Sequence, residues 1–424
     1  MNVDTRELLG KEYSPRIVDS LVSNLLQISG AVLIEGPRGC GKTMTAAQHA
    51  NSAIFLDDPD VQRLIEVDPS YPLQGESPHL IDEWQLYESI WNLVRRSVDR
   101  TEGFGHYILT GSSVPSDDVT RHSGAARFMR ISERTMTWAE KGFSTEQVSL
   151  TSLFSGNHVK TDPQTFTLNE NLHALLSSGF PAQKNLPIES AQQALRAYLQ
   201  EITRTDVPRI ADVRYGPEVL DRLIKSLARS SASEVTFKTL RQDLLTIAPN
   251  ITEATVANLV GILERLFVIE TVPAWTPRLR SKARLRRSKK YHLADAALAA
   301  AGLRAGIEQL RSDIETTGFL FESAAIHDLR VIVESLGGNL YHYRDSNGYE
   351  IDAVVQLSDG RWGAIEVKLG SGQIESGAER LLKAVEQIDA DQPPSFIAVI
   401  SGTGMTYTLP NGVQTFPLLA LGRD

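Results

Sequence analysis

Cysteine is nearly absent from this chain, which has a single one, Cys40, among its 424 residues. One cysteine excludes an internal disulfide and a cysteine-rich zinc site, and it fits the reducing cytoplasm. The sequence also lacks an apolar run of about 18 residues, so we predict no transmembrane helix and no membrane partner. Its first residues are polar and include acids, which is unlike a signal peptide. We therefore expect a cytoplasmic location.

Internal repeats and low-complexity tracts are also missing, and the charge balance shows no excess of basic residues. The chain has 43 Lys and Arg against 52 Asp and Glu, a net charge of −9. This charge gives no general attraction to nucleic acid, so any basic contact surface must be local. A content of 42% hydrophobic and 22% charged residues is typical of a globular protein. The length predicts two to four domains.

The most informative motif is GxxxxGK[ST] at positions 36–43, between an apolar run at 31–34 and a predicted helix at 44–50. Glycines let successive backbone N–H groups face a phosphate chain, and the helix N-terminus adds its positive end. We predict that Lys42 contacts the β- and γ-phosphates of ATP and that the Thr43 hydroxyl binds Mg²⁺. A chance match in a glycine-rich turn is the alternative. The predicted nucleotide-binding residues are Gly36, Pro37, Arg38, Gly39, Cys40, Gly41, Lys42, Thr43 and Met44.

A second predicted strand, at 79–82, ends in two carboxylates, Asp82 and Glu83. In P-loop NTPases the first acid at such a strand end holds Mg²⁺, and the second can polarise the attacking water. We assign Asp82 to nucleotide and metal binding and Glu83 to the role of catalytic base. The alternative is an exposed acidic strand end.

Hydroxyl residues and arginines follow the next predicted strand, at 107–113. The pattern places Thr110 or Ser112 beside the γ-phosphate as a polar sensor, although an ordinary strand-to-loop transition would look the same. Further on, Arg121 and Arg127 are candidates for an arginine that acts in trans on the nucleotide of a neighbouring chain in a homo-oligomer. For each of them, a solvated surface arginine is the alternative.

Together these motifs resemble the prokaryotic AAA-fold P-loop ATPases. More narrowly, the chain resembles the subgroup that is fused to a C-terminal PD-(D/E)XK nuclease-like domain of uncharacterised function. Phrases at 178–181, 291–295 and 318–322 match this subgroup as well. The segment 134–138 departs from it, because the expected proline is missing. The resemblance implies an α/β fold whose first module is of the AAA type.

The middle of the chain is predicted to be helical and then to form a winged helix-turn-helix. Residues 165–230 have helical periodicity, and helices at 236–245 and 252–264 precede a strand at 267–272. Residues 278–290 then contain eight Lys or Arg in thirteen positions, a local patch that could contact the phosphates of DNA or RNA. A solvated loop or a protein-binding wing are the alternatives. The predicted nucleic-acid contacts are Arg278, Arg280, Lys282, Arg284, Arg286 and Arg287.

The last hundred residues contain a second chemical pattern. Glu322 lies near the start of a predicted helix, Asp352 on a predicted strand, and Glu366 and Lys368 two apart on the next strand. Residues two apart on a strand project to one face. This order resembles the PD-(D/E)XK arrangement of restriction-endonuclease-like domains, with the motif's Pro-Asp element replaced by Glu350-Ile-Asp352, which keeps the acid. The resemblance implies that the three acids bind Mg²⁺ or Mn²⁺ and that Lys368 acts on the attacking water.

These observations predict three parts: an AAA-type P-loop ATPase domain at 1–150, a helical and winged-helix region at 151–305, and a nuclease-like α/β domain at 306–424. The expected function is an ATP-binding and ATP-hydrolysing protein that couples its nucleotide state to a metal-dependent nuclease-like domain. The alternative is a regulatory ATPase switch whose tail is a non-cutting scaffold for DNA or a partner protein.

Overall fold

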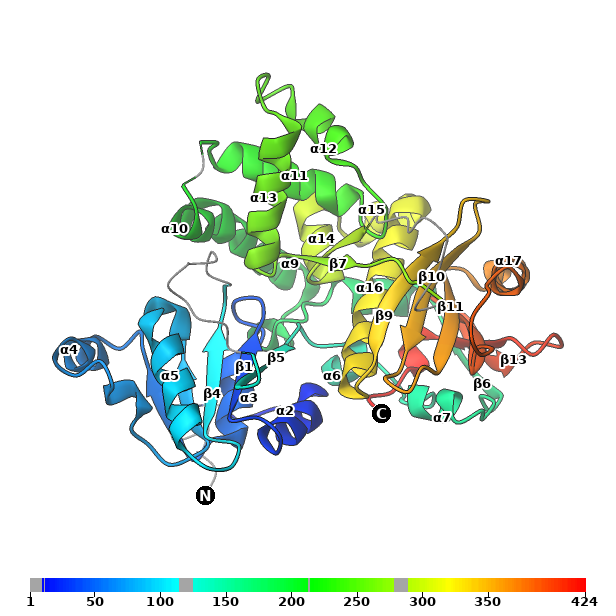
Figure 1. Cartoon of the computed structure of the whole chain (residues 1–424). Helices are drawn as coiled ribbons and strands as arrows, with labels where there is room; N and C mark the ends of the chain where they lie inside the picture. The colour runs from blue at the N-terminus through cyan, green and yellow to red at the C-terminus, as the bar shows by residue number, and fades with distance from the viewer. Residues whose placement is uncertain (1–9, 11, 114–124, 213, 278–288) are drawn as a thin grey trace. The chain divides into compact units, whose positions relative to one another are not determined.

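The computed structural model describes residues 10, 12–113, 125–212, 214–277 and 289–424 (Figure 1). The chain divides into two compact units. The first unit comprises Met1–Thr135 with Ile262–Val268, and the second comprises Met136–Gly261 with Ile269–Asp424. Positions 150 and 305, the predicted domain boundaries, both fall within the second unit.

The first unit contains a parallel sheet of five strands in the order β2-β3-β4-β1-β5. The strands are β1 (Ala31–Glu35), β2 (Ser52–Phe55), β3 (His79–Asp82), β4 (Tyr107–Gly111) and β5 (Phe128–Ser132). Its helices are α2 (Val18–Leu26), α3 (Lys42–His49), α4 (Pro59–Val67), α5 (Ser89–Arg100) and the 3₁₀ helices η1 (Tyr71–Leu73) and η2 (Trp84–Leu86). The predicted strands β1, β3 and β4 and the helix after the P-loop are confirmed.

Two hydrophobic cores lie on the two faces of this sheet, because side chains alternate along each strand. Leu33 of β1 packs in the core that contains Trp84 and Trp91. Its neighbour Val32 packs in the other core, with Ala46 of α3. Burial on both faces explains why the sequence of β1 is almost entirely apolar.

The second unit contains a mixed sheet of seven strands in the order β6-β13-β14-β12-β11-β10-β9. Its strands are β6 (Asp162–Phe166), β9 (Asn339–Arg344), β10 (Glu350–Gln356), β11 (Trp362–Lys368), β12 (Phe396–Ser401), β13 (Gly404–Thr408) and β14 (Gln414–Pro417). Two helices pack on it, α16 (Ile314–Ser335) and α17 (Ile374–Glu386). The predicted strands β10 and β11 and the predicted helix within α16 are confirmed.

Helix α14 (Ala296–Leu303) of the second unit is rich in buried alanine and contacts α9 (Ile188–Glu201) and α11 (Pro217–Arg229). The other helices of this unit are α6 (Trp138–Lys141), α7 (Leu150–Phe154), α8 (Leu168–Leu176), η3 (Pro181–Gln183), the π-helical turn η4 (Ile202–Asp206), α10 (Val207–Ile210), α12 (Phe237–Leu244), α15 (Ile307–Ser312), η5 (Ser371–Gln373) and η6 (Leu418–Ala420). Helix α13 (Glu253–Arg265) begins in the second unit, and its last four residues belong to the first. Along the chain, α11, α12 and α13 precede the antiparallel pair β7 (Ile269–Val272) and β8 (Lys290–Leu293).

Candidate functional site

The P-loop joins β1 to α3 and takes the shape that its glycines permit. Gly41 has φ +121°, a conformation that residues with a side chain rarely adopt. Gly36 lies against β5's continuation: a Cβ at this position would come 2.0 Å from the carbonyl oxygen of Glu133. These two positions therefore require glycine for reasons of backbone geometry.

The Lys42 ammonium is buried within this loop. Its Nζ donates to the carbonyl oxygens of Gly36, at 3.1 Å, and Pro37, at 2.9 Å. The side chain thus points into the concave side of the loop, where a phosphate chain is expected to bind in a P-loop.

Thr43, in the first turn of α3, lies close to Asp82 at the carboxyl end of β3 and to Thr110 near the carboxyl end of β4, because β4 lies between β1 and β3. The Thr43 hydroxyl donates to Asp82 Oδ1 at 2.9 Å, and the Thr110 hydroxyl donates to the same oxygen. Burial raises the pKa of Asp82 to about 6, although both hydroxyl hydrogen bonds act in the opposite direction. The site is therefore an acid held by neutral hydroxyl donors.

Glu83 is held in place by its own set of neutral donors. Its backbone has φ +56°, an uncommon left-handed conformation for a residue with a side chain. The Ser112 hydroxyl donates to Glu83 Oε2 at 2.9 Å, and the Gln85 amide donates to the same oxygen. The two alternatives for the sensor are thus both near the acids, with Thr110 on Asp82 and Ser112 on Glu83. Gln85 was not predicted from any sequence motif.

A buried ion pair lies beneath the P-loop. Arg16 Nη1 donates to Glu133 Oε1 at 2.9 Å and to the carbonyl oxygen of Cys40 at 2.9 Å. The Thr45 hydroxyl of α3 donates to the same Glu133 oxygen. Burial raises the pKa of the Cys40 thiol to about 11, so this thiol stays protonated at neutral pH. The ion pair joins the loop, α3 and the end of β5, and sequence reasoning missed it.

Of the two candidate arginines, the structure describes only Arg127. Arg121 lies outside the described residues. Arg127 precedes β5, where its carbonyl accepts from the Ala31 N–H, and its Nε donates to Asp99 at 2.7 Å. Arg127 therefore lies near the amino end of β1, whereas the P-loop of its own chain follows the carboxyl end of the same strand. A role in trans remains a prediction for both.

In the second unit, the four predicted nuclease-like residues come together with one residue that the sequence did not single out. Glu322 lies on α16, Asp352 on β10, and Glu366 and Lys368 on β11. Lys290 of β8 approaches Glu322 Oε1 at 2.8 Å and Asp352 Oδ1 at 3.8 Å. We call these five residues the carboxylate cluster.

Lys368 serves the other half of the carboxylate cluster. Its Nζ lies 2.6 Å from Glu366 Oε1 and 3.7 Å from Asp352 Oδ2. Burial and the charge of Asp352 raise the pKa of both Glu322 and Glu366 to about 7. Lys368 opposes both shifts, and Lys290 opposes that of Glu322. The neighbouring carboxylates raise the pKa of Lys290 and Lys368, although burial opposes it, so both ammoniums remain charged.

The resemblance to PD-(D/E)XK domains implies a divalent metal ion at these acids, but their surroundings do not fit one. Among the described residues, no group of three or more His, Cys, Asp or Glu is arranged to hold a metal ion. The carboxylate oxygens of Glu322 and Glu366 instead face ammonium groups. A metal role for Glu322, Asp352 and Glu366 remains a prediction that this arrangement does not favour.

The six predicted nucleic-acid contacts, Arg278 to Arg287, lie outside the described residues. From the same basic run, the structure describes Lys289, which is exposed, and Lys290, which is largely buried in the carboxylate cluster.

The segments 178–181, 291–295 and 318–322, on which the narrower resemblance rests, lie close to α14 and to one another. Asp295 Oδ2 accepts from the Gly179 N–H at 2.7 Å, and Asp295 Oδ1 caps α14 by accepting from the Ala297 N–H at 2.8 Å. His292 and Ser323 lie 3.0 Å apart, Nδ1 to Oγ. These residues are buried, and their contacts hold the helices and β8 together.

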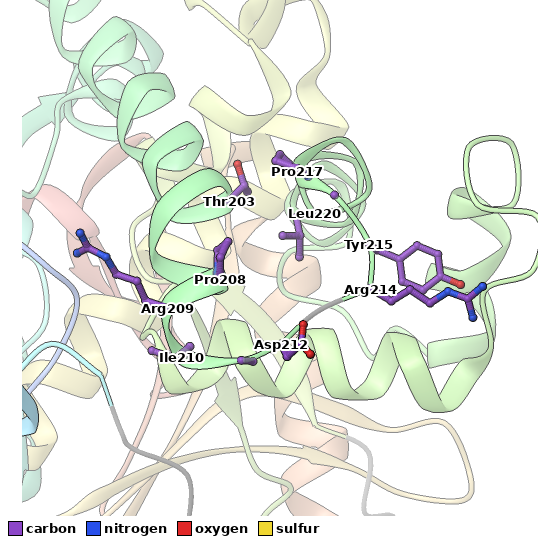
Figure 2. A pocket seen from close by; sticks show the side chains of 11 residues that line it. Thr203, Pro208, Arg209, Ile210, Asp212, Arg214, Tyr215, Pro217 and Leu220 are labelled. Atoms are coloured by element: carbon purple, nitrogen blue, oxygen red, sulfur yellow. The ribbon is translucent and has the colours of Figure 1, made fainter.

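An open pocket of about 670 Å³ lies around η4, α10 and the start of α11 (Figure 2). Thr203 and Leu220 line it, but the side chains of Arg209 and Arg214 lie on opposite sides and point away from one another. Its charged groups do not converge on a common point, so it is not the site of the predicted chemistry.

Comparisons with known proteins divide the chain into three matched regions. Residues 29–140 match a family model described as an AAA domain. Residues 170–309 and 317–421 match two models, each described as a domain of unknown function (DUF8612 and DUF4143). No curated protein matches the chain.

Among solved structures, the Walker-type ATPase of Pyrococcus abyssi is similar at 14% identity, over 69% of this chain and 96% of that chain, with a TM-score of 0.41. In the part of the chain that the structure describes, no helix has both the length and the apolarity that a membrane span requires. The AAA match covers the loop and the strand ends described above, and on this basis the chain is a P-loop ATPase.

Proposed function

We propose that this ATPase is a Mg²⁺-dependent switch whose nucleotide state controls nucleic-acid binding by the second unit, without cutting. The observation that carries the ATPase chemistry is the contact between Thr43 of the P-loop helix and Asp82 at the end of β3, 2.9 Å apart. It brings the two expected metal-binding groups together at the carboxyl end of a parallel sheet.

The P-loop residues would hold the triphosphate of ATP. A phosphate is a stronger acceptor than a carbonyl oxygen, so we expect Lys42 to exchange its bonds to Gly36 and Pro37 for the β- and γ-phosphates. The backbone N–H groups of the loop and the start of α3 would bind the same phosphates. Arg38, Gly39, Cys40, Gly41 and Met44 would contribute through this backbone.

Thr43 and Asp82 would hold Mg²⁺, which neutralises charge on the β- and γ-phosphates. The second hydroxyl that donates to Asp82, that of Thr110, is also neutral, so the carboxylate charge of Asp82 stays available for a cation. Glu83 would orient and deprotonate the attacking water, and the Ser112 and Gln85 hydrogen bonds would fix its carboxylate for this purpose.

Steady-state ATP hydrolysis with Mg²⁺ tests this part of the proposal. The wild-type chain should hydrolyse ATP, and Lys42→Ala should abolish both nucleotide binding and turnover. Arg63→Ala is a matched control, because Arg63 is an exposed cation of the same unit. Unchanged hydrolysis by Lys42→Ala would remove the P-loop from the proposal.

Binding of nucleic acid is supported by the order of elements before the basic run. The helices α11, α12 and α13 precede the β7–β8 pair, and an isolated bridge from Ser233 to Tyr291 adds a third paired segment. This order is typical of a winged helix, and the sequence between β7 and β8 is rich in Arg and Lys. A concentrated positive patch on an acidic chain is expected to release counterions from a phosphate backbone.

A metal-dependent nuclease is the second candidate function. The order of Glu322, Asp352, Glu366 and Lys368 on one helix and two adjacent strands favours it. The two ammoniums that occupy the carboxylate cluster favour the non-cutting alternative.

Incubation with single- and double-stranded DNA and RNA, with Mg²⁺ or Mn²⁺ and with ATP, ADP or no nucleotide, separates the two functions. The proposal predicts binding whose affinity changes with nucleotide and products of unchanged length. Metal-dependent cleavage that Lys368→Ala abolishes would establish the nuclease instead. An absence of any nucleic-acid binding would leave the ATPase and remove its proposed target.

A further inference from the structure

We infer that Lys290 takes the cation position of the carboxylate cluster, so that Glu322, Asp352 and Glu366 form an internal ion-pair network in place of a divalent-metal site. This inference deepens the proposed non-cutting role and rests on it for its meaning in the cell.

The position of the Lys290 Nζ is the first argument. It lies between two acids from different elements, 2.8 Å from Glu322 Oε1 and 3.8 Å from Asp352 Oδ1. The side chains of Lys290 and Glu322 are only 12% and 14% exposed. A Mg²⁺ ion needs oxygen ligands at about 2.0–2.1 Å in an octahedral arrangement. An ammonium at this point fills the same space and carries a repelling charge.

The engagement of Asp352 is the second argument. Its Oδ1 faces Lys290, whereas its Oδ2 accepts from the Val367 N–H at 2.9 Å and lies 3.7 Å from Lys368. Each oxygen of this carboxylate therefore faces a positive group from a different side. In a nuclease of this type, the acid at this position would bind the metal ion. Here Asp352 contacts two lysines instead.

The charge balance is the third argument. The carboxylate cluster contains three acids and two lysines, so its net charge with every group ionised is −1. A buried group of three carboxylates without a cation would be strongly destabilised. Together the two lysines supply the +2 charge that one divalent ion would supply, and each of these residues lies on a helix or a strand.

Lys368 alone could not provide this compensation. Its Nζ bonds to Glu366 Oε1 at 2.6 Å and to the carbonyl oxygen of Val367 at 3.0 Å, on the β11 side of the carboxylate cluster. Glu322 on α16 has Lys290 as its closest cation. Removal of Lys290 should therefore uncover Glu322 and Asp352 together.

The test is Mn²⁺ binding to the full chain without nucleotide, followed by electron paramagnetic resonance of free Mn²⁺. Lys290→Met keeps the length of the side chain and removes its charge. Lys289→Met is the matched control, because Lys289 is the adjacent, exposed lysine. We expect Lys290→Met to bind one Mn²⁺ more per chain than the wild type does, with an affinity for this additional ion at least tenfold higher than that of the same site in the wild type. Lys289→Met should bind Mn²⁺ as the wild type does.

A double variant and a melting-temperature measurement locate the additional ion. Asp352→Asn in the Lys290→Met background should abolish the gain, and Mn²⁺ should raise the melting temperature of Lys290→Met but not that of the wild type. Equal Mn²⁺ binding by Lys290→Met and the wild type would overturn the inference. So would an additional ion that survives the Asp352→Asn change.

If Lys290→Met does not fold, the wild type still decides the question. The inference predicts that Asp352→Asn leaves the Mn²⁺ binding of the wild-type chain unchanged, and a loss of bound Mn²⁺ in that variant would overturn it. None of these measurements involves nucleic acid or ATP hydrolysis. Failure of this inference is therefore distinguishable from failure of the proposed function.

Discussion

The acids at the end of β3 and the acids of the carboxylate cluster, one group in each unit, have partners that differ in charge. Asp82 and Glu83 accept hydrogen bonds from the hydroxyls of Thr43, Thr110 and Ser112. In the carboxylate cluster, Glu322 and Glu366 are paired with the ammoniums of Lys290 and Lys368. Burial raises the pKa of acids in both places.

The comparison shows that acids on adjacent elements do not by themselves define a metal site. Hydroxyl donors orient a carboxylate and leave its negative charge to attract a cation. Ammonium donors orient the carboxylate and also neutralise it. The first arrangement is suited to a metal that arrives with its substrate, and the second to a permanent internal network.

The largest expected effect is a difference between matched Asp→Asn substitutions in the two units. Asp82→Asn should reduce Mg²⁺-dependent ATP hydrolysis to the background of the assay, because it removes the charge that holds the metal. Asp352→Asn should leave the rate per chain within twofold of the wild type. Phosphate release at saturating Mg²⁺-ATP measures both. A comparable loss in both variants would show that the two acid groups act as one site.

Substitution of the proposed base should have the next largest effect. Glu83→Gln should keep nucleotide affinity and lower the rate of hydrolysis by about 10²–10⁴-fold, the usual contribution of a general base. Glu366→Gln is the counterpart in the second unit and should leave the rate unchanged. Hydrolysis by Glu83→Gln at the wild-type rate would remove Glu83 from this role.

The buried ion pair of Arg16 with Glu133 tests whether burial determines how much an ion pair contributes to the free energy of unfolding. Arg16→Ala leaves Glu133 buried without its cation and should lower the free energy of unfolding by about 3–5 kcal/mol. The exposed pair of Arg63 with Asp60 is the control, and Arg63→Ala should cost less than about 1 kcal/mol. Urea denaturation measures both, and equal losses would contradict the reasoning.

The local parts of both sites could be predicted from the sequence, since motif and geometry coincide there. The P-loop, the strand ending in Asp82, and the strand that bears Glu366 and Lys368 depend on neighbours in sequence. The contact of Arg16 with Glu133 spans 117 residues, and that of Lys290 with Glu322 spans 32. No periodicity reports which distant side chains meet, so both ion pairs were missed.

The strands β6 and β14 were missed for a related reason. The sequence of β6 contains Asp162 and Pro163 and buries only Phe166, so it has no strand-like alternation. Its pairing with β13 is set by the tertiary fold, and β14 is only four residues long. Such segments become strands because a sheet offers them a partner.

The smallest expected effect is a change in the pH dependence of stability. The folded-state pKa of Glu366 is raised from 4.5 to about 7, so the native state binds this proton more tightly than the unfolded chain does. Its contribution to stability is full below about pH 4.5 and is lost as the pH rises through 7. Glu366→Gln removes this titration.

Melting temperatures between pH 5 and 8 measure the effect. The difference between Glu366→Gln and the wild type should become more positive as the pH rises. Glu375→Gln, at an exposed position on α17, should show a flat difference. A difference that falls with pH would reverse the sign of the reasoning for the carboxylate cluster.

The central claim is that only the hydroxyl-bounded acids take up a divalent metal. Equilibrium dialysis of the wild-type chain with Mn²⁺ and a non-hydrolysable ATP analogue tests it directly, by counting bound metal per chain. We predict one Mn²⁺, lost in Asp82→Asn and retained in Asp352→Asn. Two Mn²⁺ per chain, with one lost in Asp352→Asn, would contradict the claim.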